Sequence, residues 1–122
     1  MKKILIVDDE PNIVMSLEYL FKKEGFQVFI ARDGEEALAT IAKDMPDLVL
    51  LDIMMPKVDG YQVIKYLKAS EDLKNIKVIF LSAKSKAMDI EKGLSLGADK
   101  YIAKPFSTKK LVKEVKELIN TK

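Results

Sequence analysis

Cysteine and histidine are both absent from this 122-residue sequence, and their absence limits the chemistry that the chain can perform. Without cysteine, the chain forms neither a disulfide bond nor a thiolate metal site. Without histidine, it lacks the commonest general base of enzymes and the commonest protein ligand of transition metals. A reactive site in this chain must therefore be built from carboxylates, hydroxyl groups, lysines and a bound ion.

Long apolar segments are absent as well. The sequence has no apolar stretch near the roughly 20 residues that a membrane-spanning helix needs. Its first residues, Met1 to Lys3, lead directly into a strand-like segment and not into the apolar core of a signal peptide. We therefore expect a cytoplasmic protein that has no membrane partner.

A strong charge of one sign is also missing, because the formal net charge is only +2, but the charges are unevenly spread. Residues 84–122 carry ten lysines and five acidic residues, and a basic segment of this kind raises the question of nucleic-acid binding. The lysines alternate with acidic residues, however, and no aromatic platform for base stacking accompanies them. We expect solvated helix faces and no direct binding of nucleic acid.

What the sequence does contain is a regular alternation of apolar tetrads and amphipathic segments. Strand-like segments occur at residues 4–7, 28–31, 48–51, 78–81 and 101–103. Segments with helical spacing begin near Pro11, after Asp33, near Gly60, at residues 87–96 and after Ser107. Five such units predict a flavodoxin-like three-layer α/β sandwich, a (βα)5 fold with a five-stranded parallel sheet. Right-handed crossovers favour the strand order 2-1-3-4-5. We expect a single domain over residues 1–122.

Local signals mark where the helices begin and end. Pro11 suits the first turn of the first helix, and Gly97 is a natural stop for the fourth. Asp33 and Glu36 have the spacing of a capping box, in which each side chain bonds the backbone N–H of the other residue. Asp59 is expected to cap the third helix and not to bind a metal.

Three carboxylates follow two of the most apolar strands. Asp8 and Asp9 come directly after residues 4–7, and Asp52 comes directly after residues 48–51. If these strands are neighbours in a parallel sheet, the three acids meet at its carboxyl edge, where open α/β folds bind their ligands. Three anions repel one another unless a cation lies between them. Carboxylate oxygens favour Mg²⁺, Mn²⁺ or Ca²⁺, and a site completed by waters and a phosphate suits Mg²⁺ best.

Two further polar residues end strands at the same predicted edge. Ser82 follows the fourth strand, and Lys104 follows the fifth and precedes Pro105. A carboxylate, a divalent ion, a hydroxyl group and an ammonium group together suit phosphoryl transfer, because the transferred group carries negative charge that donors and cations must neutralise. An aspartate can attack phosphorus in line and hold the group as an acyl phosphate.

At this point the sequence closely resembles the receiver domain of two-component response regulators, in the form of a single domain similar to a chemotaxis regulator. The resemblance covers essentially the whole chain. It rests on Asp8-Asp9, Asp52, the Met55-Pro56 run that ends at Gly60, Ser82-Ala83 and Lys104-Pro105-Phe106.

The resemblance implies a phosphorylation-dependent switch in which Asp52 accepts a phosphoryl group from a sensor histidine kinase or a phosphotransfer protein. The metal, Mg²⁺ or Mn²⁺, would be held by Asp8, Asp9, Asp52 and the backbone carbonyl of Met54. Ser82 would bond a phosphoryl oxygen, Lys104 would pair with the acyl phosphate, and the Lys104–Pro105 peptide would be cis. Tyr101 matches the switch aromatic, whose ring moves inward when the hydroxyl group of Ser82 shifts.

The same resemblance implies the surfaces through which the switch communicates. The fourth helix, fifth strand and fifth helix would form the surface for a downstream effector, an output domain or a phosphorylation-dependent homodimer. The first helix would lie on the side that docks the kinase.

Other interpretations stay open from the residues alone. Asp8 and Asp9 could be turn and capping residues, and Tyr101 could serve packing only. Ser82 could be a loop hydroxyl group and Lys104 a surface lysine. An aspartyl-phosphate hydrolase of similar topology is the alternative function, but no cap for a substrate is inserted. A flavodoxin-like cofactor carrier would need a phosphate-binding loop, which the first strand–helix turn lacks.

Three positions depart from the pattern of the family. Ser82 stands where threonine is common, so the hydroxyl group remains without the methyl group that helps to fix its rotamer. Met54 and Lys84 lack the carboxylate and amide groups that position the attacking water in some members. We expect a signalling domain and not an enzyme, with weak Mg²⁺-dependent self-phosphorylation from small donors and with self-dephosphorylation that is not among the fastest of the family.

Overall fold

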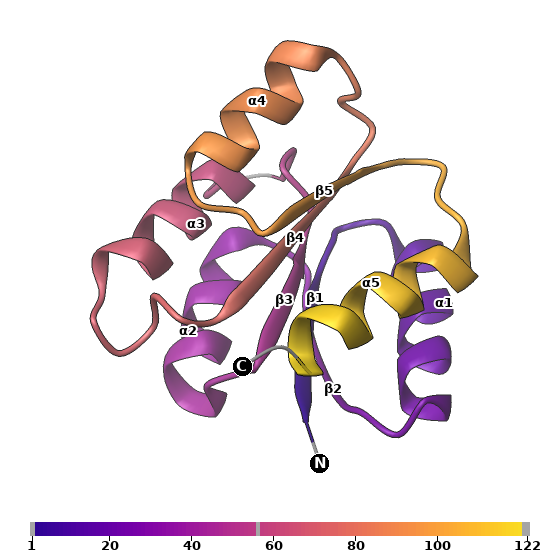
Figure 1. Ribbon diagram of the computed structural model, residues 1–122. Helices are drawn as coiled ribbons and strands as arrows, with labels where there is room; N and C mark the ends of the chain where they lie inside the picture. The colour runs from indigo at the N-terminus through magenta and orange to yellow at the C-terminus, as the bar shows by residue number, and fades with distance from the viewer. Residues whose placement is uncertain (1, 56, 121–122) are drawn as a thin grey trace.

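The computed structural model describes residues 2–55 and 57–120, in which strands and helices alternate along the chain (Figure 1). The strands are β1 Lys3–Val7, β2 Gln27–Ala31, β3 Leu48–Leu51, β4 Lys77–Ser82 and β5 Lys100–Ala103. The helices are α1 Pro11–Lys23, α2 Gly34–Asp44, α3 Gly60–Ala69, α4 Ala87–Ser95 and α5 Thr108–Asn120. Pro56, part of the motif used in the sequence comparison, lies outside the described residues. Within them, no helix combines the length and the hydrophobicity that a membrane crossing requires.

The strands form one parallel sheet in the order β2-β1-β3-β4-β5, which confirms the predicted fold class. β1 and β3 are direct neighbours, and Val7 pairs with Leu51 at the end of their shared register. The residues that follow this pair are Asp8 and Asp52. The register therefore brings the two acids out of the sheet at the same point.

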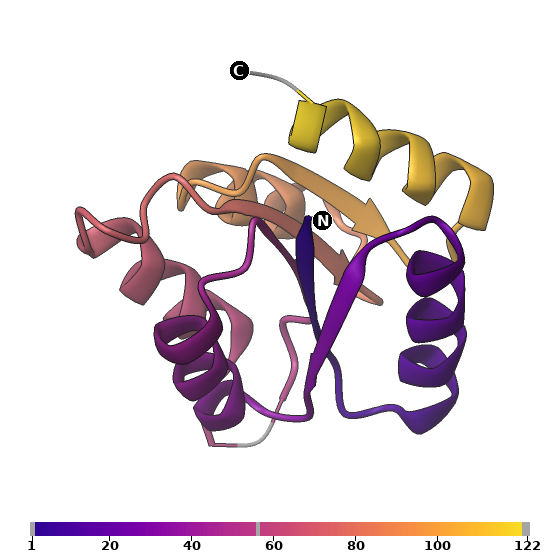
Figure 2. The same cartoon turned by 90° about the horizontal axis from the view of Figure 1, so that it is seen from below.

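The helices cover the two faces of the sheet unequally (Figures 1 and 2). α1 and α5 lie on one face, and α2, α3 and α4 lie on the other. Each face has its own apolar core, because consecutive strand residues point to opposite sides. The first core joins the sheet to α1 and α5 through Leu17, Phe21, Leu111 and Val115. The second joins it to α2 and α3 through Ala37, Ile41, Val63, Ile64 and Leu67.

The helix ends largely follow the predicted signals. Pro11 opens α1, and Gly97, with a φ of 110°, follows the end of α4. The Asp33 side chain accepts a bond from the Glu36 N–H at 2.9 Å, but the returning bond of a capping box is not formed there. The complete capping box lies at α3, where Asp59 and Gln62 bond each other's backbone N–H groups. Asp59 therefore caps α3 as predicted.

Candidate functional site

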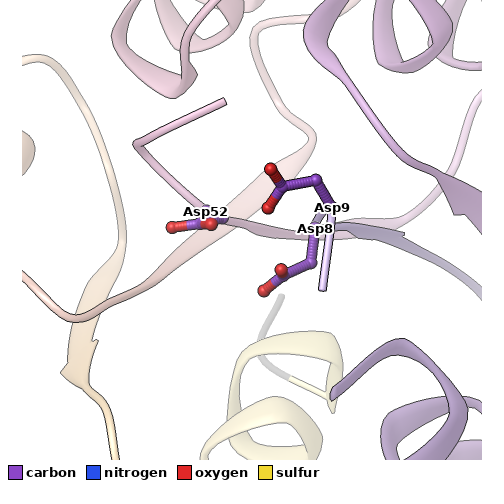
Figure 3. Close-up of side chains that lie close together, drawn as sticks. All are labelled: Asp8, Asp9 and Asp52. Atoms are coloured by element: carbon purple, nitrogen blue, oxygen red, sulfur yellow. The ribbon is translucent and has the colours of Figure 1, made fainter. Parts of the chain in front are cut away.

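The carboxylates of Asp8, Asp9 and Asp52 converge beside the ends of β1 and β3 (Figure 3). One oxygen atom from each of them lies within 4.8 Å of the others, which is close enough for a single cation to contact all three. Asp8 and Asp52 are buried, with 2% and 7% of their surface exposed, whereas Asp9 is exposed. The site is therefore a buried acidic pair with a third carboxylate on its solvent side.

Backbone hydrogen bonds hold the two buried acids in place. The Asp8 N–H donates to the Ala31 carbonyl oxygen at 3.1 Å, and the Asp52 N–H donates to the Val7 carbonyl oxygen at 3.0 Å. The Asp8 side chain in turn accepts a bond from the Glu10 N–H at 2.9 Å, which fixes one of its oxygens. The sheet thus extends its hydrogen-bonding pattern by one residue into the site.

The environment of Asp52 opposes its negative charge. Burial, followed by repulsion from Asp8, raises the pKa of Asp52 to about 6, although attraction to Lys104 partly offsets the shift. Clustered carboxylates whose ionisation is disfavoured are stabilised by a divalent cation, and an all-oxygen donor set suits a hard ion. The three acids therefore fit Mg²⁺ or Mn²⁺.

Lys104 reaches the same cluster from the end of β5. Its Nζ atom donates to Asp8 Oδ2 at 2.8 Å and lies 3.7 Å from Asp52 Oδ2. Burial lowers the pKa of Lys104, but the hydrogen bond to Asp8 and the charge of Asp52 outweigh it and leave the pKa raised. The Lys104–Pro105 peptide bond is cis, as the resemblance implied. A protonated ammonium group thus stands beside the acid pair.

Ser82 and Tyr101 are connected through the backbone of Lys84. The buried Ser82 hydroxyl oxygen accepts a bond from the Lys84 N–H at 3.2 Å, and the Tyr101 hydroxyl group donates to the Lys84 carbonyl oxygen at 2.6 Å. The Tyr101 ring is half-buried and lies 5.9 Å from the Phe80 ring. Sequence reasoning considered only the side chain of Lys84, because nothing in the sequence marks a backbone group as a link.

The exposed rim of the site is lined by the loop after β3. Met54 lies in this loop and is 63% exposed. A cavity of about 420 Å³ lies beside it. Its lining consists of Ile53, Met54, Met55, Asp59, Tyr61 and Lys84. Tyr61 was not singled out from the sequence, since an aromatic residue at a helix start usually indicates packing alone.

Known proteins resemble this chain over most of its length. The profile of the family described as "Response regulator receiver domain" matches residues 4–116. The alkaline phosphatase synthesis transcriptional regulatory protein PhoP of Bacillus subtilis is 43% identical over 118 residues, which are 97% of this chain and 48% of that protein. The chain thus spans about half the length of this relative.

Solved structures agree with the sequence matches. The receiver domain of a signal transduction histidine kinase from Syntrophus aciditrophicus is 35% identical, with a TM-score of 0.90 over 100% of this chain and 96% of that one. The receiver domain of a Pseudomonas aeruginosa sensor histidine kinase, solved with a magnesium ion in its active-site cleft, is 28% identical, with a TM-score of 0.90 over 98% of both chains. These similarities do not favour the hydrolase alternative.

Proposed function

Because this chain belongs to the response regulator receiver domain family, we propose that it is a phosphorylation-dependent switch whose phosphoacceptor is Asp52. The observation that carries the proposal is the position of the Asp52 carboxylate, which lies at the end of β3 beside two further acids and the Lys104 ammonium group. Residues 1–122 would form the receiver unit. The chain would act in the cytoplasm, together with the histidine kinase or phosphotransfer protein that would supply its phosphoryl group.

Asp8, Asp9, Asp52 and the Met54 carbonyl would hold Mg²⁺, or Mn²⁺ in its place. The magnesium ion in the related Pseudomonas aeruginosa structure supports this assignment. When bound, the ion supplies positive charge that lowers the repulsion between the acids and the incoming phosphoryl group. The chain's own acids thereby become compatible with an anionic substrate.

In the transfer, an Asp52 carboxylate oxygen forms a bond to phosphorus while the bond between phosphorus and the donor breaks. The donor nitrogen or oxygen keeps the electron pair of the broken bond. Lys104 stands 3.7 Å from Asp52 Oδ2 and neutralises charge on the transferred group. Ser82 Oγ donates a hydrogen bond to a phosphoryl oxygen.

The switch would operate through the backbone of Lys84. Ser82 Oγ accepts from the Lys84 N–H, and the Lys84 carbonyl accepts from Tyr101. A shift of the Ser82 hydroxyl towards a phosphoryl group would change the first bond and thereby shift the Lys84 backbone, whose carbonyl accepts the second bond. The change would reach the surface formed by α4, β5 and α5, which would contact an effector, an output domain or a second copy. The exposed side chains of Met15 and Tyr19 on α1 would contact the kinase or phosphotransfer protein.

The test is incubation of the whole chain with acetyl phosphate and Mg²⁺, followed by intact mass spectrometry. We expect a mass increase of one phosphoryl group in the wild type, none in Asp52→Asn and none in the presence of a chelator. Asp9→Asn is the matched control, because it removes a carboxylate from the metal site but leaves the acceptor. It should be phosphorylated once Mg²⁺ is raised. Equal uptake by Asp52→Asn would contradict the proposal.

The lifetime of the phosphorylated form follows from the rim of the site. The side chains of Met54 and Lys84 offer no carboxylate or amide group to orient an attacking water. We predict that the acyl phosphate decays over minutes or longer, and that Met54→Asn accelerates the decay by about tenfold, below the full effect of a positioned catalytic group. Loss of the added mass, followed after the donor is removed, measures the rate. A wild-type lifetime of seconds would refute this prediction.

A further inference from the structure

The N-terminus of α2 lies against the loop that joins β3 to α3, at a position where only glycine fits. A Cβ atom placed on Gly34 would lie 2.5 Å from Val58 Cβ and 2.7 Å from the Val58 backbone carbon, and closer still to the Val58 carbonyl oxygen. Non-bonded carbon atoms do not approach one another this closely in proteins. Backbone atoms also cannot rotate away as the end of a flexible side chain can. Any side chain at position 34 must therefore displace Val58.

Val58 is part of the loop that carries the proposed metal ligand Met54. The far end of this loop is fixed to its beginning, because the Gly60 N–H donates to the Ile53 carbonyl oxygen at 2.9 Å. Gly60 also packs directly on the strand end, since a Cβ there would lie 2.8 Å from Ile53 Cα. The loop is thus held at its base by Gly60 and at its side by the contact between Val58 and Gly34.

The contact with α2 is steric and not electrostatic. Lys57 and Glu35 form the ion pair that spans the same two segments, but their charged atoms are 3.7 Å apart and their side chains are 61% and 63% exposed. Ion pairs with this exposure contribute little. Val58, in contrast, is half-buried and packs against the apolar core between α2 and α3. The close approach at Gly34 therefore determines the position of Val58 and of the loop segment around it.

We propose that Gly34 is a positioning residue for the metal site: by lacking a side chain, it seats Val58 on α2 and thereby sets the position of the Met54 carbonyl. This inference rests on the proposed function, which supplies the role of Met54. Gly34 touches neither the metal nor the reacting atoms and acts only through the loop. Helix propensity alone would favour alanine at this position. The weaker metal binding that we expect in Gly34→Ala therefore cannot result from a loss of helix propensity.

The experiment compares Mn²⁺ binding by the whole chain in its wild-type and Gly34→Ala forms, with free Mn²⁺ measured by electron paramagnetic resonance. We expect Gly34→Ala to weaken binding by about tenfold, the lower end of the effect of residues that support metal ligands. The rate of phosphorylation by acetyl phosphate should show the same shift in its half-saturating Mg²⁺ concentration. At saturating Mg²⁺ the rate should return to within about twofold of the wild type, because only the metal loop has moved.

Gly25→Ala is the matched control. Gly25 has a φ of 93°, and a Cβ added there would meet no other atom within 4 Å, so alanine strains the backbone without touching the loop. This variant should melt at a lower temperature than the wild type and bind Mn²⁺ with unchanged affinity. Glu35→Ala, which removes only the ion pair, should also bind Mn²⁺ as the wild type does.

Three outcomes would overturn the inference or its premise. If Gly34→Ala binds Mn²⁺ as tightly as the wild type, Gly34 does not position the loop. If Gly25→Ala weakens binding equally, the effect is general destabilisation. If the wild type itself binds no Mn²⁺, the proposed function falls and this inference falls with it.

A second variant keeps the test decisive if Gly34→Ala does not fold. Lys57 has a φ of 67°, a conformation that glycine adopts without strain, so Lys57→Gly lets the loop move away from α2. The double variant Gly34→Ala/Lys57→Gly should fold with weakened Mn²⁺ binding, whereas Lys57→Gly alone should bind as the wild type does. If the double variant and Lys57→Gly bind Mn²⁺ with equal affinity, the inference is overturned.

Discussion

α3 and α4 cover the same face of the sheet, yet they are attached to it very differently. α3 buries four residues, Gly60, Val63, Ile64 and Leu67. Among the described residues of α4, Gly93 alone is buried. The strands beneath them differ in the same way, because every residue of β3 is buried and every residue of β5 is half-buried.

The contacts that do hold α4 are few and involve aromatic rings. A Cβ on Gly93 would lie 2.9 Å from Tyr101 and 3.0 Å from Phe80, so the helix rests directly on these rings. The Lys92 ammonium group lies 4.1 Å from the centre of the Tyr61 ring. The acids of the site are thus built on a part of the molecule that resists displacement. The proposed response surface, with fewer buried contacts, belongs to a part that moves at a lower cost in free energy.

The largest effect expected from this contrast is in the free energy of unfolding. Leu67→Ala in α3 empties a fully buried position and should lower it by about 2–5 kcal/mol. Leu94→Ala in α4 truncates a side chain that is 44% exposed and should lower it by less than about 1 kcal/mol. Urea denaturation of the two variants and the wild type measures both losses. Equal losses would show that α4 is packed as firmly as α3.

A smaller effect is expected from pH in the metal-free protein. The pKa of Asp52 is raised to about 6 by burial, so the folded state binds this proton more tightly than the unfolded state, whose pKa is about 4. The contribution of Asp52 to stability is therefore largest below pH 4 and is lost as the pH rises towards 6, by about 1–3 kcal/mol. Asp52→Asn cannot lose this contribution.

The measurement is urea denaturation of the wild type and Asp52→Asn in chelator from pH 4 to pH 7. Subtracting the two curves removes the titration of the other carboxylates. We expect Asp52→Asn to become more stable than the wild type across this range. A difference that does not change with pH would contradict the raised pKa.

The smallest effect concerns the contact between Lys92 and Tyr61. Lys92→Ala should lower the free energy of unfolding by about 0.5–1 kcal/mol, the usual range for an exposed cation–π contact. Lys92→Arg keeps the charge over the ring and is the control. A double-mutant cycle with Tyr61→Leu isolates the interaction between the two residues. A coupling free energy of zero would show that this contact does not help to hold α4 in place.

Much of the fold could be predicted because apolar residues reveal which segments are buried. β3 was predicted without error, since all four of its residues are apolar. The other four strands begin one residue earlier than predicted, at Lys3, Gln27, Lys77 and Lys100. A polar residue at the start of a strand pairs with the neighbouring strand as the apolar residues do, but it cannot be recognised in the hydrophobic pattern.

The convergence of the acids could also be predicted, because the strand order alone brings Asp8, Asp9 and Asp52 to one edge. The sequence could not tell that Asp8 is buried and the adjacent Asp9 exposed, since the two differ only in the direction of their side chains. Nor could it show the contact between Gly34 and Val58, which joins segments that no local pattern connects. Such features depend on packing between distant parts of the chain.

The bonds of Lys84 suggest how such a protein can be tuned. Lys84 bonds Ser82 through its backbone N–H and Tyr101 through its backbone carbonyl, so a substitution of its side chain leaves both bonds available. Lys84 also lines the cavity beside Met54. A substitution of the Lys84 side chain would therefore change the lining of this cavity and leave the backbone bonds to Ser82 and Tyr101 in place.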